Sequence, residues 1–261
     1  MEVTITILIL GGTAEARLLA TALVQAGRDV VSSLAGRVRE PALPPGRVRV
    51  GGFGGVGGLA DYVRTGGIAA VVDATHPFAA GISQNAAAAA ELTGTPLLRL
   101  ERPGWADHPL ARTWSWVLDV AAARAAGERA SRPFLTSGRQ SLEAFLPWRD
   151  RSVLARVVEP PGFPLPSKWI LLTSRGPYSY AGERMIMVDH GIDLLITKDS
   201  GGSYTAAKLD AANDLGIEVV IIARPSRPST AQVTSVEAAM AWCAGLVDQP
   251  LPMPPAPLET C

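Results

Sequence analysis

Short runs of apolar, mostly β-branched residues alternate with stretches rich in alanine and leucine along the first half of the chain. Continuous apolar strands separated by helices are typical of a parallel sheet that helices cover on both faces. The predicted helices span 13–26 and 79–93, and the predicted strands span 4–10, 29–34, 47–50, 69–74 and 96–101. The first half therefore predicts one doubly wound α/β lobe.

The same alternation starts again after a junction at 119–132 that is rich in alanine and arginine. Further strands are predicted at 134–137, 152–158, 169–173, 193–197 and 218–223. We therefore expect an α/β protein of two Rossmann-like, doubly wound lobes with parallel sheets and a cleft between them. The expected divisions are 1–126 for the first lobe, 127–245 for the second lobe and 246–261 for a proline-rich tail.

The composition narrows the class of protein. Hydrophobic residues make up 48% and charged residues 18% of the 261 positions, which excludes a wholly disordered chain. The 24 Lys and Arg balance the 24 Asp and Glu, so no overall positive charge attracts nucleic acid or an acidic membrane surface. No apolar stretch approaches the roughly 18–20 residues of a membrane span, and the acidic N-terminus is unlike a secretory signal. We expect a cytoplasmic protein that binds neither nucleic acid nor membrane, and its oligomeric state stays open.

Cysteine and histidine carry little candidate chemistry. The two cysteines, Cys243 and Cys261, cannot build a disulfide framework, and no Cys/His cluster has the spacing of a zinc site. We therefore expect no metal site. Cys243 lies in an apolar AWCA segment and is expected to be a small core residue.

The turn after the first predicted strand favours an anion. Gly11 and Gly12 permit close approach of a ligand to the backbone, and Thr13 is a plausible N-cap of the helix that follows. Exposed N–H groups and the positive end of the helix dipole would attract phosphate. Glu15 in the first turn would repel a pyrophosphate, and Arg17 could offset that charge. The pattern lacks the later glycine of the G-x-G-x-x-G fingerprint, so an ordinary tight turn is the alternative.

The end of the second strand bears on the choice of cofactor. NAD sites use an acidic residue there for the ribose hydroxyls, whereas a nearby arginine suits the 2′-phosphate of NADP. This strand ends with Ser32 and Ser33, followed by Arg37, and has no acidic residue. The sequence favours NADP, although Arg37 could also be an ordinary surface residue.

The end of the fourth strand places polar residues at the same edge of the sheet. Asp73, Thr75 and His76 follow that strand, and the carboxyl ends of parallel strands face the ligand crevice. Pro77 favours an extended backbone at His76 and suits the first position of a helix. Asp73 and His76 are candidate catalytic residues, and Thr75 is a candidate cofactor contact. In the alternative interpretation, Asp73 or Thr75 only caps the helix.

Five motifs together resemble a known family. They are GGTAEAR (11–17), DATHPFA (73–79), TKDSGG (197–202), AKLDAA (207–212) and ARP (223–225). In this order and at these spacings, the motifs resemble those of the precorrin-6A reductases of cobalamin biosynthesis, over about residues 4–245. The resemblance implies two Rossmann-like lobes and NADPH-dependent reduction of one macrocycle double bond, which gives precorrin-6B. Enzymes that act on cobalt-precorrin share these motifs, so both substrates stay open.

The second lobe carries three loops of small polar and cationic residues at predicted strand ends. Such loops expose N–H groups, hydroxyls and positive charges, which suits a polycarboxylate tetrapyrrole, although each loop could also be an ordinary turn. The candidate substrate-binding residues are Ser137, Gly138, Arg139, Ser174, Arg175, Lys198, Ser200, Gly201, Gly202 and Lys208. Asp199 lies in the third loop and is a further catalytic candidate.

A Y-x-x-x-K pattern at Tyr204 and Lys208 is similar to the catalytic pair of short-chain dehydrogenases. Those enzymes carry the pair in the same domain as a longer glycine fingerprint, which this chain lacks. We expect Lys208 instead to support the preceding loop or to bind a substrate carboxylate.

The leading hypothesis is a hydride-transfer enzyme with NADPH as cofactor and no nucleophilic side chain. Asp73, His76, Asp199 or water would supply the proton to the reduced macrocycle. Two alternatives remain: a non-catalytic NADP-sensing module, and a reductase of a smaller imine or enone substrate.

Overall fold

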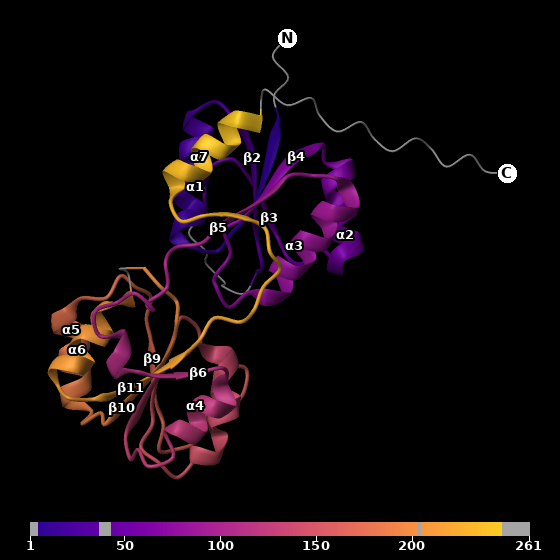
Figure 1. Cartoon of the computed structure of the whole chain (residues 1–261). Coiled ribbons are helices and arrows are strands. Elements are labelled where there is room, and N and C mark those ends of the chain that lie inside the picture. The colour runs from indigo at the N-terminus through magenta and orange to yellow at the C-terminus, as the bar shows by residue number, and fades with distance from the viewer. Residues whose placement is uncertain (1–4, 37–42, 203–204, 247–261) are drawn as a thin grey trace. The chain divides into compact units, whose positions relative to one another are not determined.

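The computed structural model describes residues 5–36, 43–202 and 205–246 (Figure 1). Arg37, Tyr204, Cys261 and nearly all of the expected tail lie outside these ranges. The chain divides into two compact units, which we call unit 1 (residues 1–102 and 226–261) and unit 2 (residues 103–225).

Unit 1 contains a parallel sheet with helices on both faces. Its described helices are α1 (Ala14–Gln25), α2 (Gly55–Thr65), α3 (Ala80–Thr93) and α7 (Val236–Gly245). Its described strands are β1 (Thr6–Leu10), β2 (Asp29–Leu34), β3 (Arg47–Val50), β4 (Ile68–Asp73), β5 (Leu97–Leu100) and β12 (Ala231–Val233). All five residues of β1 are buried, as expected for the central strand of a sheet with two covered faces.

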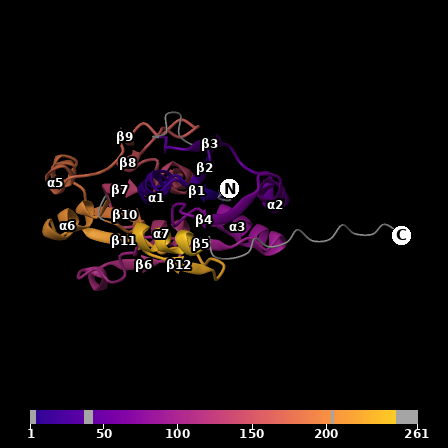
Figure 2. The ribbon, with the colours of Figure 1, turned by 90° about the horizontal axis from the view of Figure 1, so that it is seen from above.

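The strand order in unit 1 is β12-β5-β4-β1-β2-β3, and every pair is parallel (Figure 2). This order reverses between β1 and β4, which is where doubly wound sheets bind ligands. Helices α1 and α7 pack together on one face, with Leu19, Leu23 and Cys243 in their shared core. Helices α2 and α3 cover the other face. Cys243 is fully buried in this core, as we expected, and burial raises the pKa of its thiol to about 11.

Unit 2 has the same architecture. Its described helical segments are η1 (Ala111–Thr113), α4 (Val120–Ala126), η2 (Arg139–Trp148), α5 (Tyr180–Asp189) and α6 (Ala207–Asp214). Its described strands are β6 (Ser115–Val117), β7 (Pro133–Thr136), β8 (Leu154–Val157), β9 (Ile170–Thr173), β10 (Leu194–Lys198) and β11 (Glu218–Ile222). They pair in parallel in the order β6-β11-β10-β7-β8-β9, which Figure 2 also shows. The predicted α/β class with two doubly wound parallel sheets is confirmed.

The two units exchange their sixth strands. Strand β6 follows β5 along the chain but pairs with β11, whereas β12 follows β11 but pairs with β5. Residues 103–126 therefore belong to unit 2, and residues 226–245 belong to unit 1. This division differs from the boundary that we expected after residue 126. The physical reason is that each of these short strands forms its backbone hydrogen bonds with the edge strand of the other sheet, β11 or β5. It does not pair with the strand that precedes it in the sequence.

None of the helices within the described ranges is long and apolar enough to cross a membrane. The same residues contain no group of three or more His, Cys, Asp or Glu side chains placed to hold a metal ion.

Candidate functional site

The turn between β1 and α1 has the form of an anion site. The Thr13 hydroxyl accepts a hydrogen bond from the Ala16 N–H (3.1 Å) and donates to the Ala74 carbonyl (2.7 Å), which ties the two sides of the switch point together. Gly12 has a φ of +114° and is exposed, and a Cβ built on it would meet no atom within 4 Å. Gly11 donates its N–H to the Ser33 carbonyl (2.9 Å). A ligand can therefore approach the backbone at Gly12, where the dipole of α1 favours negative charge.

Glu15 and Arg17 lie in the first turn of α1, both partly buried. The Glu15 carboxylate accepts a hydrogen bond from Arg102 Nη1 at 2.7 Å, so Arg102 balances its charge. The role that we predicted for Arg17, to offset repulsion between Glu15 and a pyrophosphate, stays a prediction. Sequence reasoning missed Arg102 because it lies 87 positions from Glu15 in the chain.

The carboxyl end of β2 brings Ser32 and Ser33 into the sheet, both buried. The Ser33 hydroxyl accepts a hydrogen bond from Arg49 Nη1 at 3.0 Å, whereas the Ser32 hydroxyl is buried with no hydrogen-bond partner among the described residues. Arg37, the arginine that we predicted for this position, lies outside the described residues. Arg49 was missed, and the alternation of arginine with valine in β3 was the available signal.

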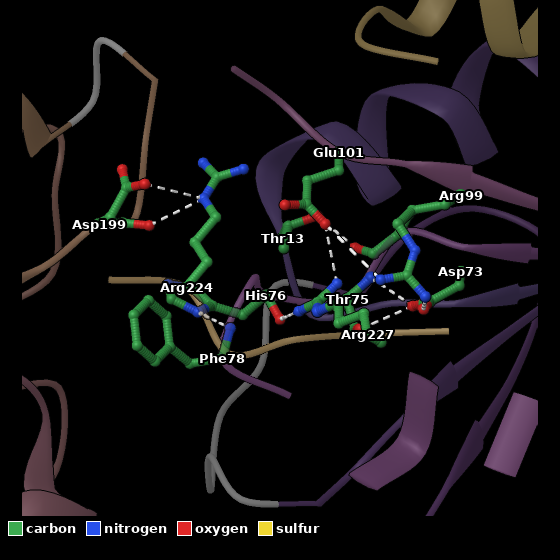
Figure 3. Close-up of polar contacts among 11 residues, drawn as sticks. Thr13, Asp73, Thr75, His76, Phe78, Arg99, Glu101, Asp199, Arg224 and Arg227 are labelled. Atoms are coloured by element: carbon green, nitrogen blue, oxygen red, sulfur yellow. Dashed lines mark hydrogen bonds and ion pairs between the residues drawn. The ribbon is translucent and has the colours of Figure 1, made fainter. Parts of the chain in front are cut away.

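A buried network of charges lies behind the end of β4 (Figure 3). Asp73 is 1% exposed, and its Oδ1 accepts hydrogen bonds from the Thr75 N–H (3.2 Å) and the Thr75 hydroxyl (2.6 Å). Its Oδ2 lies 3.4 Å from Arg99 Nη2, in an ion pair that is almost wholly buried. Arg99 lies on β5, and its Nη1 is 3.8 Å from Glu101 Oε2. These contacts hold Asp73 and Thr75 in place within unit 1.

Arg227 extends this network to His76. One of its terminal nitrogens donates to the Glu101 carboxylate (2.8 Å), and the other donates to the His76 carbonyl (2.8 Å). His76 itself is partly buried, and its Nδ1 accepts a hydrogen bond from the Phe78 N–H at 3.2 Å (Figure 3). Because Nδ1 is an acceptor, the neutral imidazole carries its proton on Nε2. The contacts of Arg227 and Phe78 therefore hold both the backbone and the ring of His76 in this turn.

The first turn of unit 2, after β7, is built differently. Ser137 is buried, and its hydroxyl is hydrogen-bonded to the Ser141 hydroxyl at 2.7 Å. Gly138 has a φ of +87° and precedes η2, a 3₁₀ segment with Pro147 inside it. The Arg139 guanidinium donates to Glu159 at 3.0 Å, which joins the ends of β7 and β8.

The turn after β9 holds Ser174 and Arg175. The Ser174 N–H donates to the Val157 carbonyl (3.0 Å), and the Ser174 carbonyl accepts from the Tyr178 hydroxyl (3.1 Å). The Arg156 guanidinium stacks on the Tyr178 ring, with Arg156 Cζ 3.8 Å from the ring centroid. Arg175 is exposed, so its charge is available to a ligand.

The turn after β10 is fixed by Asp199. Its carboxylate accepts the Trp105 N–H (2.9 Å) and lies 3.3 Å from Arg224 Nε, which also donates to the Asp199 carbonyl (3.1 Å; Figure 3). A Cβ on Gly104 would lie 2.6 Å from this carboxylate, so a larger residue there would displace it. Asp199 thus has internal partners within unit 2 that hold this loop, and the catalytic role that we predicted for it stays a prediction.

The residues beside Asp199 form the remaining part of this loop. Lys198 is partly buried at the end of β10, and the Ser200 N–H donates to the Lys198 carbonyl (2.6 Å). Gly201 and Gly202 have φ values of +65° and +70°. A Cβ on Gly201 would overlap the Pro103 carbonyl oxygen, so this glycine is needed for close packing of the backbone.

Lys208 lies inside unit 2, with 3% of its surface exposed. Its ammonium donates to the Thr205 carbonyl (2.6 Å) and lies 4.8 Å from the centroid of the Trp105 ring. Of the two roles that we predicted for Lys208, these contacts favour support of the preceding loop over binding of a substrate carboxylate.

Comparison with known proteins gives a consistent result over nearly the whole chain. A family model described as "Precorrin-6x reductase CbiJ/CobK" matches residues 6–244. The chain is 51% identical to a precorrin-6A reductase of Rhodococcus erythropolis, over 90% of this chain and 96% of that protein. It is 32% identical to a cobalt-precorrin-6A reductase of Priestia megaterium, over 84% of this chain and 90% of that protein. The solved structure titled "CobK precorrin-6A reductase" is similar with a TM-score of 0.85 and 39% identity, covering 93% of this chain and 97% of that chain.

Proposed function

Because the chain belongs to the precorrin-6x reductase family, an oxidoreductase family of cobalamin biosynthesis, we propose that it reduces one carbon–carbon double bond of precorrin-6A with NADPH, giving precorrin-6B. The structural observation that carries this proposal is the turn between β1 and α1, where Gly12 and the Thr13 cap leave a nucleotide phosphate room to approach. The match across both units disfavours a sensing module that only binds NADP.

Several residues of unit 1 fit a dinucleotide. The N-terminus of α1 would hold the pyrophosphate, with Arg17 close by, and the polar end of β2 would hold the adenosine ribose. Thr75 stays a proposed cofactor contact through its position at the switch point, although its hydroxyl donates to Asp73. When bound, NADPH supplies a hydride from its nicotinamide ring, and the protein orients that ring and excludes water.

We assign the tetrapyrrole to the polar loops of unit 2. The carboxyl ends of β7, β9 and β10 lie at one edge of a parallel sheet, so their loops share that edge. Arg139, Arg175 and Lys198 place three basic side chains there, of which Arg139 also pairs with Glu159. Basic side chains on separate loops suit a substrate with several carboxylates. A smaller imine or enone substrate would not need cations spread over three loops.

Reduction of a double bond needs a proton as well as a hydride. We propose His76 as the residue that delivers it, directly or through water. Its Nδ1 accepts the Phe78 N–H, so Nε2 is the nitrogen that would hand over the proton. The donor would be the imidazolium form, which takes a proton from solvent and returns to the neutral ring after the transfer. Asp73 is less suited, because it is buried against Arg99 and Thr75. It acts instead by holding the turn that carries His76.

Some relatives are named for a metal-free substrate, and others are named for a substrate that contains cobalt. Identity is 41–51% to proteins named precorrin-6A reductase and 27–32% to proteins named cobalt-precorrin-6A reductase. This difference supports metal-free precorrin-6A as the substrate.

Anaerobic assays with NADPH and a panel of corrin precursors, with and without cobalt, test the proposal. We expect oxidation of NADPH, followed at the nicotinamide absorbance band, only when a precorrin-6A is present. We expect a product that is heavier by two hydrogens and a faster rate with the metal-free substrate. Failure of every tetrapyrrole to stimulate NADPH oxidation would exclude the function.

The same assay tests the role of His76. His76→Ala should lower turnover at saturating substrate at least about tenfold, or about 1.4 kcal/mol of barrier, while the melting temperature stays nearly unchanged. An unchanged turnover would show that the proton comes from elsewhere. A fall of several degrees in the melting temperature would instead make His76 a structural residue.

A further inference from the structure

Arg49 lies near the carboxyl end of β3, in register with Ser33 on β2. Its Nη1 donates to the Ser33 hydroxyl (3.0 Å) and to the Gly51 carbonyl (2.9 Å), and its Nη2 donates to the Gly52 carbonyl (3.0 Å). All three acceptors are uncharged. They therefore fix the position of the guanidinium without neutralising its charge.

Arg47, two positions earlier on the same strand, shows the contrast. Its Nη2 lies 2.5 Å from the Asp29 carboxylate, so its charge is balanced. The hydrogen bond from the Thr6 hydroxyl, together with Arg47, holds the pKa of Asp29 below its usual range. No carboxylate of the described chain lies within ion-pair distance of Arg49, although Arg49 is itself partly buried. A partly buried cation without a carboxylate partner is suited to an anionic ligand.

Aromatic rings fix the plane of this guanidinium. Arg49 Cζ lies 3.7 Å from the centroid of the Phe53 ring and 5.2 Å from that of Tyr62, and the two rings meet edge to face at 5.3 Å. An arginine has five N–H groups. Three of them make the bonds to Ser33, Gly51 and Gly52, which leaves the Nε N–H and one on Nη2 without a partner among the described residues. Two such donors on a planar, oriented cation match the oxygens of a phosphate group.

The position of Arg49 in the fold identifies the phosphate. In doubly wound dinucleotide sites the adenosine ribose lies at the end of the second strand, where an acidic residue selects NAD and an arginine accepts the 2′-phosphate of NADP. Ser33 occupies that end of β2, and Arg49 contacts it from β3. Resting on the proposed use of NADPH, we infer that Arg49, with Ser33, binds the 2′-phosphate and is the residue that selects NADPH over NADH.

The experiment measures binding and needs no substrate. Affinities for NADPH, NADH, adenosine 2′,5′-bisphosphate and adenosine 5′-monophosphate are measured by calorimetry for the unmutated protein, Arg49→Gln and Arg47→Gln. Arg49→Gln should weaken NADPH and the bisphosphate roughly tenfold or more, since charge-assisted hydrogen bonds are lost, and should leave NADH and the monophosphate within about twofold. Arg47→Gln is the matched control, because it removes the same charge from the same strand, and it should preserve the preference.

A second variant covers the case in which Arg49→Gln does not fold. Ser33→Asp places a carboxylate against Arg49, which neutralises the cation and repels the 2′-phosphate, so it should narrow or reverse the preference for NADPH. Equal loss of NADPH and NADH affinity in Arg49→Gln would overturn the inference, because Arg49 would then only hold the turn at 51–53. A preference that survives both variants would overturn it while the proposed function stands. If the unmutated protein binds neither dinucleotide, the proposed function fails, and the inference fails with it.

Discussion

Units 1 and 2 share one strand order but differ in the first turn that follows the central strand. In unit 1, β1 leads through Gly11, Gly12 and Thr13 into α1, a 12-residue α-helix with a side-chain N-cap. In unit 2, β7 leads through Ser137 and Gly138 into η2, a 10-residue 3₁₀ segment that contains a proline and has no side-chain cap. The sheets are alike, but the helix starts are not.

The same strand order therefore leads into two different helix starts, which differ in how well they can attract an anion. A helix attracts phosphate through aligned peptide dipoles and unpaired N–H groups at its first turn, and a 3₁₀ segment aligns these groups poorly. The loops of unit 2 instead offer hydroxyls and basic side chains, which suit the several carboxylates of the proposed substrate. The difference supports our assignment of the cofactor to unit 1 and the substrate to unit 2.

The largest expected effect concerns the buried charges of unit 2. Arg156 and Glu183 form a bidentate pair at 2.5 and 3.0 Å, with side chains 4% and 1% exposed. Glu183→Gln leaves the Arg156 charge buried without its partner and should lower the free energy of unfolding by about 3–5 kcal/mol. Urea unfolding followed by tryptophan fluorescence measures this loss, because five of the six tryptophans lie in unit 2.

The matched control is Glu128→Gln. Glu128 also pairs with an arginine of unit 2, Arg151, but its side chain is 67% exposed. This variant should cost less than about 1 kcal/mol, because exposed ion pairs contribute little. Equal losses in the two variants would mean that burial of the Arg156–Glu183 pair is not what stabilises unit 2.

An intermediate effect is expected from Lys198, which lies at the end of β10 in the proposed substrate edge. Lys198→Ala should weaken binding of precorrin-6A by about 1–3 kcal/mol, the range for a charge-assisted contact, and leave NADPH affinity within about twofold. Arg17→Ala should have the opposite pattern. Lys168→Ala is the control, since this exposed lysine donates only to the Asp150 carbonyl among the described residues. Loss of NADPH binding with retained substrate binding in Lys198→Ala would reverse the roles of the units.

The smallest expected effect is on NADPH affinity, when Gly12 of unit 1 and Gly138 of unit 2 are each replaced by alanine. Gly12 and Gly138 both have positive φ, and a Cβ on either would meet no atom within 4 Å. Alanine should therefore strain both turns alike. Only Gly12→Ala should weaken NADPH binding, by about tenfold or about 1.4 kcal/mol, because its Cβ occupies the space through which the phosphate approaches. Equal NADPH affinities in the two variants would remove the distinction between the two first turns.

The fold class could be predicted from the sequence because both sheets consist of continuous apolar strands, a local signal. Helix α2 could not, since it contains three glycines and begins after another, Gly54. The unit boundaries could not either, because the pairing of β6 with β11 and of β12 with β5 is set by contacts between distant segments.

In the candidate site, too, contacts between distant segments could not be predicted from the sequence. The glycine turn and the residues after β4 were visible as motifs, but their partners were not. Arg227 lies 151 positions from His76, and Arg102 lies 87 positions from Glu15. Arginines far apart in sequence come together only through the sheet, so no spacing rule identifies them.

The exchanged strands also determine the order in which the units can be completed as the chain leaves the ribosome. Most of unit 1 precedes unit 2 in the chain, yet the edge of β5 has no β12 to pair with until the whole of unit 2 has been synthesised. Unit 2 has no such delay, because β6 is already present when β11 appears. All strands of unit 2 are therefore available before the last strand of unit 1, which reverses the usual order in which the earlier domain is completed first. During this interval the nascent chain carries an open strand edge, the kind of surface that pairs wrongly with other chains.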